Sequence, residues 1–179
     1  MHLRWDGPFQ LARSHRHGRK IDHLSSVETD FGLYQVYAQH PVYGRSLVFI
    51  GQAIDQPFAM RISQQPWSHA GDTDPDLLDV YVGRMVGSET ITRERWALDL
   101  SAAEILLVHA HAPALNATHI REGPGFRRCA EVRVLNWGAC AALAREVSGL
   151  VWTSAALAAQ RQDPYRQSDL LRASHLAPL

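Results

Sequence analysis

The pattern of hydrophobic and polar positions changes after the first thirty residues of the chain. Residues 1–30 show little periodicity and many polar side chains, so we expect an irregular polar arm in which residues 5–9 (WDGPF) form an apolar anchor. Residues 31–38 (FGLYQVYA) and 45–51 (RSLVFIG) are rich in β-branched and aromatic side chains. Turn-forming residues at 41–44 separate them, so the pattern predicts an antiparallel pair of strands.

Side chains in the first of these strands should alternate between its two faces. Tyr34 and Val36 are expected on one face, and Leu33, Gln35 and Tyr37 on the other. The hydroxyl groups of Tyr34 and Tyr37 are therefore expected on opposite sides of the sheet.

The rest of the chain reads as alternating helices and strands. In order, the pattern predicts a short helix capped by Asp55 and ending near Pro66, a third strand at 77–87, a helix from Ser101 to Pro113, a strand at 131–137, a helix at 138–152 closed by Gly149, and a helical or frayed tail from Ala155. The predicted fold class is α+β, with a small central antiparallel β-sheet of three strands flanked by helices, preceded by the arm and followed by a strand and helix extension.

Composition favours one globular domain. The chain has 179 residues, of which 46% are hydrophobic, enough for a substantial core. No apolar run approaches the roughly 18 residues that a membrane span needs, and the N-terminal residues lack the apolar centre of a signal peptide. We therefore expect a soluble cytoplasmic protein without a membrane partner. Cys129 and Cys140 lack metal-ligand spacing and are expected to be buried thiols.

Charge is balanced, with 18 basic and 18 acidic residues. A strongly basic field, the simplest argument for a nucleic-acid partner, is thus absent from the composition. A local patch remains open: residues 13–20 (RSHRHGRK) concentrate cations without an acid, as a solvated arm or as a phosphate-contacting segment.

Five features occur in a fixed order: Gly32-Leu33-Tyr34, Phe49-Ile50-Gly51, Arg61 on the following helix, Glu104 on the later helix, and Asn116 just beyond it. This ordered set resembles the GIY-YIG nuclease domain. The resemblance covers residues 31–117 and implies a domain there, between the arm at 1–30 and a C-terminal extension at 118–179 packed on the same domain.

The resemblance implies a metal-dependent endonuclease that hydrolyses phosphodiester bonds of DNA. Tyr34 is then the candidate base, Arg61 the phosphate clamp, Glu104 the ligand of Mg²⁺ (or Mn²⁺), and Asn116 a supporting residue. These assignments fit the chemistry, because a guanidinium binds two phosphoryl oxygens and a carboxylate is a hard oxygen ligand. Further candidates for substrate binding are Gly51, Gln52 and His69.

Each residue also has a purely structural interpretation. Tyr34 fits a half-buried strand position and Arg61 an exposed helix position. Glu104 fits the first turn of a helix, and Asn116 a turn after Pro113.

The chain also departs from the family pattern. Phe49 replaces the usual tyrosine, the spacing from Gly51 to Arg61 is longer than the common one, and Gln65 stands where some members have histidine. These departures motivate an alternative function, a catalytically inactive scaffold that binds nucleic acid or protein. A third possibility is a subunit that forms a homodimer, or binds a protein partner, through the C-terminal extension.

Overall fold

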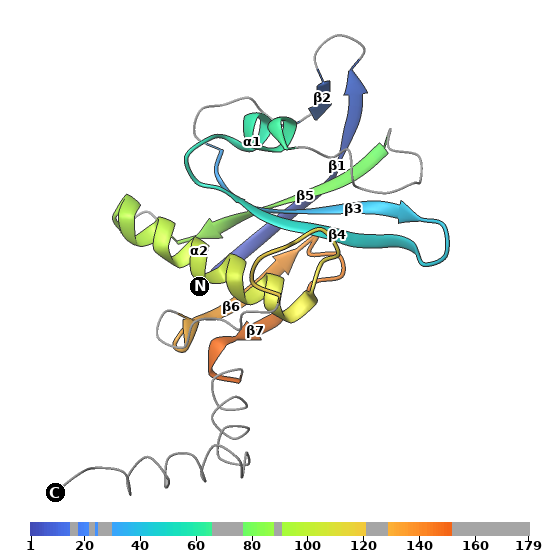
Figure 1. The fold of residues 1–179 in the computed structure, drawn as a ribbon. Helices are drawn as coiled ribbons and strands as arrows, with labels where there is room; N and C mark the ends of the chain where they lie inside the picture. Colours follow the sequence, from blue (N-terminus) through green and yellow to red (C-terminus); the bar gives the residue numbers. More distant parts are fainter. Residues whose placement is uncertain are drawn as a thin grey trace, which may run out of the picture.

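The structure, a computed structural model, describes residues 1–14, 18–21, 24, 30–65, 77–87, 91–120 and 129–151. Figure 1 shows a curled sheet with helices packed on it. The elements are β1 (His2–Ser14), β2 (Gly18–Ile21), β3 (Gly32–His40), β4 (Gly44–Ala53), α1 (Phe58–Gln64), β5 (Leu77–Val86), α2 (Arg93–His111), β6 (Arg133–Gly138) and β7 (Glu146–Ser148).

One mixed sheet of seven strands organises the described residues. Its order is β4-β3-β5-β1-β6-β7, and β2 pairs with β1. β5 occupies one edge of β1, while β6 and β2 share the other edge at its two ends. Only the pairing of β1 with β6 is parallel among these ladders. β4 is therefore an edge strand of the sheet, and both α1 and α2 contact it.

The predicted fold class, a three-stranded sheet flanked by helices, is wrong. The three expected strands are present as β4-β3-β5, but the sheet continues through β1, β6 and β7. The expected polar arm contains the long strand β1, whose side chains Leu3, Trp5 and Leu11 are fully buried. This strand was missed because Gly7 and Pro8 interrupt its alternation at a register shift between Asp6 and Phe9.

Two helix predictions also need correction. The helix expected to begin at Ser101 begins at Arg93, where the Thr92 side chain accepts a hydrogen bond from the Arg95 N–H. The helix expected at 138–152 is mostly replaced by turns and by β7, because Val147 pairs with Val134 of β6 and is buried in the core. The local preference of this segment for a helix is outweighed there by its pairing with β6.

Other local predictions are confirmed. β3 and β4 form the expected antiparallel pair around a turn at 41–43, and β5 is the expected third strand. α1 ends at Gln64, before Pro66, and α2 ends before Pro113. The expected cap of α1, Asp55, is wrong, because Pro57 occupies the N-cap position and no side chain caps the helix. Cys129 and Cys140 are free and buried. The tail from Ala155 lies outside the described residues.

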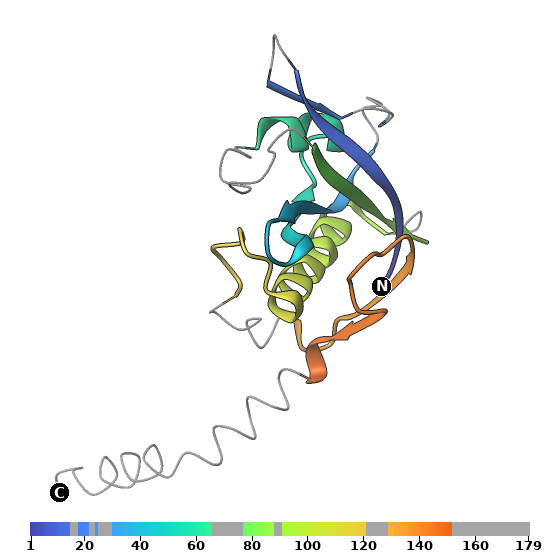
Figure 2. The same ribbon diagram turned by 90° about the vertical axis from the view of Figure 1, so that its right-hand side faces the viewer.

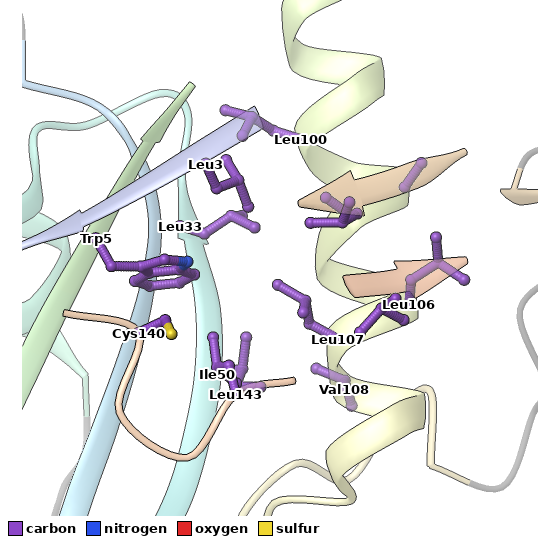
Figure 3. Packing of buried hydrophobic residues seen from close by; sticks show 14 of the residues in the cluster. Leu3, Trp5, Leu33, Ile50, Leu100, Leu106, Leu107, Val108, Cys140 and Leu143 are labelled. Atoms are coloured by element: carbon purple, nitrogen blue, oxygen red, sulfur yellow. The ribbon is translucent and has the colours of Figure 1, made fainter. Parts of the chain in front are cut away.

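The core consists of two clusters on the two faces of the β3–β4 hairpin. One joins α2 to the sheet through Leu33, Ile50, Leu106 and Leu107, among others, and is drawn in Figure 3. The other joins α1 to the sheet and contains Tyr34. Figures 1 and 2 accordingly place α1 and α2 on opposite sides of the hairpin. The predicted separation of Tyr34 from Tyr37 is confirmed, because the two residues belong to different clusters.

The described helices include none with the length and apolar character needed to cross a membrane.

Candidate active site

The two signature segments meet in the β3–β4 ladder, where Tyr34 lies directly opposite Gly51. A Cβ atom at Gly51 would lie 2.7 Å from Tyr34 Oη and 2.6 Å from Phe49 Cε1. Real Cβ contacts of this length essentially do not occur, so any larger residue would displace one of the rings. Gly51 therefore leaves the space in which the Tyr34 phenol crosses the edge strand. This steric role is shown by the structure, and the expected contact of Gly51 with substrate stays a prediction.

Gly32 opens β3 for a related reason. Its φ of +153° is rarely adopted by residues with a side chain, and a Cβ there would clash with the carbonyl oxygen of Gly83 on β5. The same Cβ would lie 3.0 Å from the ring of Phe58, which begins α1. A glycine at this position thus lets β3 start tightly between β5 and α1.

The Tyr34 hydroxyl is buried without a normal hydrogen bond. Tyr34 is fully buried, and its Oη has no hydrogen-bond partner of standard geometry among the described residues. Burial raises the pKa of Tyr34 to about 12, while the nearby Arg61 and Gln65 side chains act in the opposite direction. The phenol is therefore protonated at neutral pH and retains unused hydrogen-bonding capacity.

Arg61 reaches this hydroxyl from the exposed face of α1. The opposite face of the helix is anchored in the core by Phe58 and Ile62, both fully buried. The Phe58 N–H donates a hydrogen bond to the Asp30 carbonyl at 3.0 Å, which ties the start of the helix to the start of β3. A short and otherwise marginal helix is thereby held in place, and Arg61 with it.

Glu104 approaches from α2. Its side chain is half-buried between neighbours, such as Ala103 and Leu106, that pack into the core. Burial raises the pKa of Glu104 to about 7, against the lowering effect of the Arg61 charge. Glu104 in turn raises the pKa of Tyr34. These mutual effects indicate that the phenol, guanidinium and carboxyl groups from β3, α1 and α2 lie close together.

The position of Glu104 along α2 excludes the structural interpretation in which it stabilises the first turn of the helix. Because α2 begins at Arg93, Glu104 lies in the middle of the helix, where the favourable interaction of an acid with the helix N-terminus is lost. A half-buried carboxyl group in this position costs stability unless something pairs with it.

Gln52 links the site to α2. Its Oε1 accepts a hydrogen bond of 3.0 Å from the Ser101 hydroxyl, one helical turn before Glu104. This contact fixes the helix against the edge strand β4. Gln52 also lines the adjacent cavity, and its expected contact with substrate stays a prediction.

Asn116 supports the site through the backbone. Its Oδ1 accepts from the Ile50 N–H at 3.0 Å, and its Nδ2 donates to the Ile50 carbonyl at 2.8 Å. The Leu115 N–H donates to the Val48 carbonyl at 2.8 Å. The segment after α2 therefore continues the sheet hydrogen bonding along the free edge of β4, beside Gly51. Asn116 thus positions the strand, and both of its side-chain hydrogen bonds go to the Ile50 backbone.

A cavity of about 710 Å³ opens beside Arg61, and neither Tyr34 nor Glu104 is among its lining residues. Arg61, Gln52 and Ser101 line it, together with Glu94 and Asp55. We call it the active-site cavity. It provides the space that a phosphate group and its flanking sugars would need.

Three residues near the site were not among the predicted site residues, and the structure does not describe one residue that was. Glu94 and Ser101 escaped notice as lining residues because the start of α2 was placed too late. Gln65 was noted only as a departure, although its spacing of four residues from Arg61 puts both on one side of α1. His69 lies outside the described residues, as does most of the loop after α1.

Glu104 is the candidate carboxyl ligand for an ion such as Mg²⁺ at this site. Among the described residues, no group of three or more His, Cys, Asp or Glu side chains gathers as a metal site. Mg²⁺, however, is commonly held by one or two carboxylates, with waters and substrate phosphate completing its shell. Glu104 supplies one such carboxyl group, three residues beyond Ser101, which lines the cavity, and no described residue donates a hydrogen bond to it.

Comparison of the chain with protein-family models, with curated proteins and with solved structures finds no match.

Proposed function

We propose that the chain is a metal-dependent endonuclease that hydrolyses DNA phosphodiester bonds at the site formed by Tyr34, Arg61 and Glu104. One observation carries the proposal. Arg61 lines the active-site cavity, and its charge acts on two groups with complementary roles in phosphoryl chemistry, the Tyr34 phenol from β3 and the Glu104 carboxyl group from α2.

Arg61 binds the phosphate in this proposal. Its guanidinium is exposed, lines the active-site cavity and stays charged at every relevant pH. A planar fork of N–H donors matches two non-bridging phosphoryl oxygens. Charge that develops on these oxygens during attack is thereby stabilised.

Glu104 is the residue that would hold Mg²⁺ or Mn²⁺. The metal, when bound, supplies positive charge next to the phosphate and the leaving oxygen. The carboxyl group must be ionised to act as a ligand, and its pKa of about 7 makes it only partly ionised at neutral pH before a cation arrives.

Tyr34 positions the attacking water. Its Oη has no hydrogen bond of standard geometry among the described residues, so in the proposed mechanism it donates a hydrogen bond to, or accepts one from, a water held near Arg61. It keeps its own proton at neutral pH because burial raises its pKa to about 12. Removal of a proton from the water by Tyr34 therefore requires additional positive charge at the site, to which Arg61 already contributes.

The test is metal-dependent cleavage of supercoiled plasmid DNA. We expect nicked and linear products from the unaltered protein with Mg²⁺ or Mn²⁺, and at least about 100-fold slower cleavage by Glu104→Gln. Glu131→Gln is the matched control, because Glu131 is exposed and lines a different cavity. Equal cleavage by Glu104→Gln and Glu131→Gln would refute the proposal.

A second candidate is a scaffold that binds nucleic acid or protein without cutting. Two observations favour it: the phenol of Tyr34 is fully buried, and Phe49 stacks on it without a hydroxyl of its own. Salt-dependent retention of DNA without any metal-dependent cleavage would select this function over the nuclease.

A further inference from the structure

A second cavity lies beside the first turn of α2. It has a volume of about 460 Å³, and its lining includes Phe31, Arg84, Arg93 and Trp96. We call it the aromatic cavity. None of its lining residues belongs to the active-site cavity, so the two are separate hollows.

Two aromatic rings form part of the wall. Phe31 and Trp96 meet edge to face, with ring centroids 6.5 Å apart and planes at 85°. Both side chains are only half-buried, although each carries a large apolar surface. Ring faces of this kind are the surfaces on which nucleic-acid-binding proteins stack unpaired bases.

The two arginines of the cavity differ in charge balance. Arg84 is neutralised, because it pairs with Asp30 at 2.6 Å and with Asp6 at 2.7 Å. Arg93 lies 5.5 Å from the centre of the Phe31 ring and donates a hydrogen bond to the Ile54 carbonyl at 3.1 Å. Within the described part of the chain, no carboxylate forms an ion pair with Arg93. Its positive charge is thus available to an anion.

The two cavities are adjacent along α2. Glu94 and Ala97 line the active-site cavity, while Arg93 and Trp96 line the aromatic cavity. Ile54, whose carbonyl holds Arg93, also lines the active-site cavity. Trp96 lies eight residues before Glu104, which is about 12 Å along the helix axis at about 1.5 Å per residue. This length corresponds to roughly three to four base steps of B-form DNA.

We propose that the aromatic cavity binds an unstacked base of the DNA strand that passes through the active-site cavity. Trp96 and Phe31 provide the stacking surface, and Arg93 contacts a neighbouring phosphate. This inference rests on the proposed function for its ligand, DNA, but it concerns binding, and its test does not depend on cleavage.

The test compares two single-stranded probes of equal length and charge without divalent metal. One is fluorescently labelled oligodeoxythymidylate, and the other is the same sugar-phosphate chain with abasic units throughout. We expect the unaltered protein to bind the base-containing probe about ten-fold more tightly, and Trp96→Ala to lose this preference. Binding is measured by fluorescence anisotropy at low salt.

Matched variants separate stacking from general damage. Trp137→Ala removes an exposed tryptophan on β6, outside the aromatic cavity, and is expected to keep the preference. Trp96→Phe retains a ring and is expected to keep most of it. Arg93→Gln should weaken binding of both probes equally and lower the salt-dependence slope by about 0.7, the value for one phosphate contact on a single strand.

The inference is overturned if the unaltered protein binds both probes equally or binds neither, or if Trp96→Ala retains the preference. Its failure is distinct from failure of the proposed function. Preference for bases without metal-dependent cleavage would sustain the aromatic cavity and reject the nuclease, whereas cleavage without the preference would do the reverse.

Discussion

Tyr34 and Tyr37 lie three residues apart on β3, and the protein treats their hydroxyl groups in opposite ways. Tyr37 Oη donates to Gln35 Oε1 at 2.8 Å and accepts from the Ala142 N–H at 2.9 Å. Tyr34 Oη has no such partner among the described residues. Burial raises the pKa of both phenols, so desolvation alone does not distinguish them. The difference lies in hydrogen bonding.

The arginine beside each tyrosine differs in the same way, because one is held by hydrogen bonds within the protein and the other lines a cavity. Arg45 packs 4.3 Å from the centre of the Tyr37 ring and is held by Asp79 at 2.6 Å and by the Tyr81 hydroxyl at 2.7 Å. Arg61 instead faces the active-site cavity near Tyr34. The Tyr37 face is thus a closed structural network, whereas the Tyr34 face leaves polar groups available. Unsatisfied buried groups cost stability, and their retention at a cavity is typical of functional sites.

The largest expected effect is on catalysis. Under the proposed nuclease mechanism, Tyr34→Phe should slow plasmid cleavage by about 10²- to 10⁴-fold, because it removes the group proposed to position the attacking water. Tyr37→Phe should change the rate by only a few-fold, since its hydroxyl faces the other side of the sheet. Initial rates at saturating metal measure both. Similar losses in the two variants would abolish the functional distinction between the tyrosines.

A smaller effect is expected on the pH dependence of stability. The folded-state pKa of Glu104, about 7, lies above its ordinary value of 4.5, so the folded protein binds an additional proton between these values. Stability is therefore lost as pH rises through this window. Glu104→Gln removes the buried charge and should stabilise the fold by roughly 3 kcal/mol above pH 7, and hardly at all below about pH 4.5.

Urea unfolding of both proteins across this pH range measures the difference. Glu146→Gln is the matched control, because Arg133 lowers the pKa of the Glu146 carboxyl group. This control should show no stabilisation at high pH. A pH-independent effect of Glu104→Gln would show that the carboxyl group is not buried as described.

The smallest expected effect is on the stability of the two tyrosine variants at neutral pH. Tyr37→Phe should destabilise the fold by about 1–3 kcal/mol, because the buried Gln35 side chain and the Ala142 N–H lose their partner. Tyr34→Phe should be neutral or stabilising by up to about 1 kcal/mol, since no satisfied hydrogen bond is lost. The free energy of unfolding in urea checks both. Destabilisation by Tyr34→Phe equal to that by Tyr37→Phe would mean that Oη has a structural partner.

Several features of the site were predictable because they depend on neighbouring residues. Alternation along residues 31–38 and the turn at 41–44 predict the β3–β4 hairpin, and with it the opposition of Tyr34 and Gly51. The apolar positions around Arg61 predict a helix that turns this side chain away from the core. Pro113 predicts the end of α2.

Other features depend on partners far along the chain. Residues 2–14 form a central strand only because β5 and β6 are available on its two sides, and an interrupted pattern gives no local sign of this. Val147 joins a strand because Val134 lies opposite, despite a helix-like sequence. The role of Asn116 follows from the free backbone groups of Ile50, a long-range contact across 66 residues.

Residue types and their local periodicity thus decide which segments become strands or helices, since backbone preference and side-chain alternation act over a few positions. They also identify the groups with suitable chemistry. The approach of Arg61 and Glu104 to one phenol, the loss of water around it and the shift of the Glu104 pKa arise only when α1 and α2 pack around the edge of β4. Desolvation and charge proximity are properties of the packed molecule, so tertiary structure alone decides them.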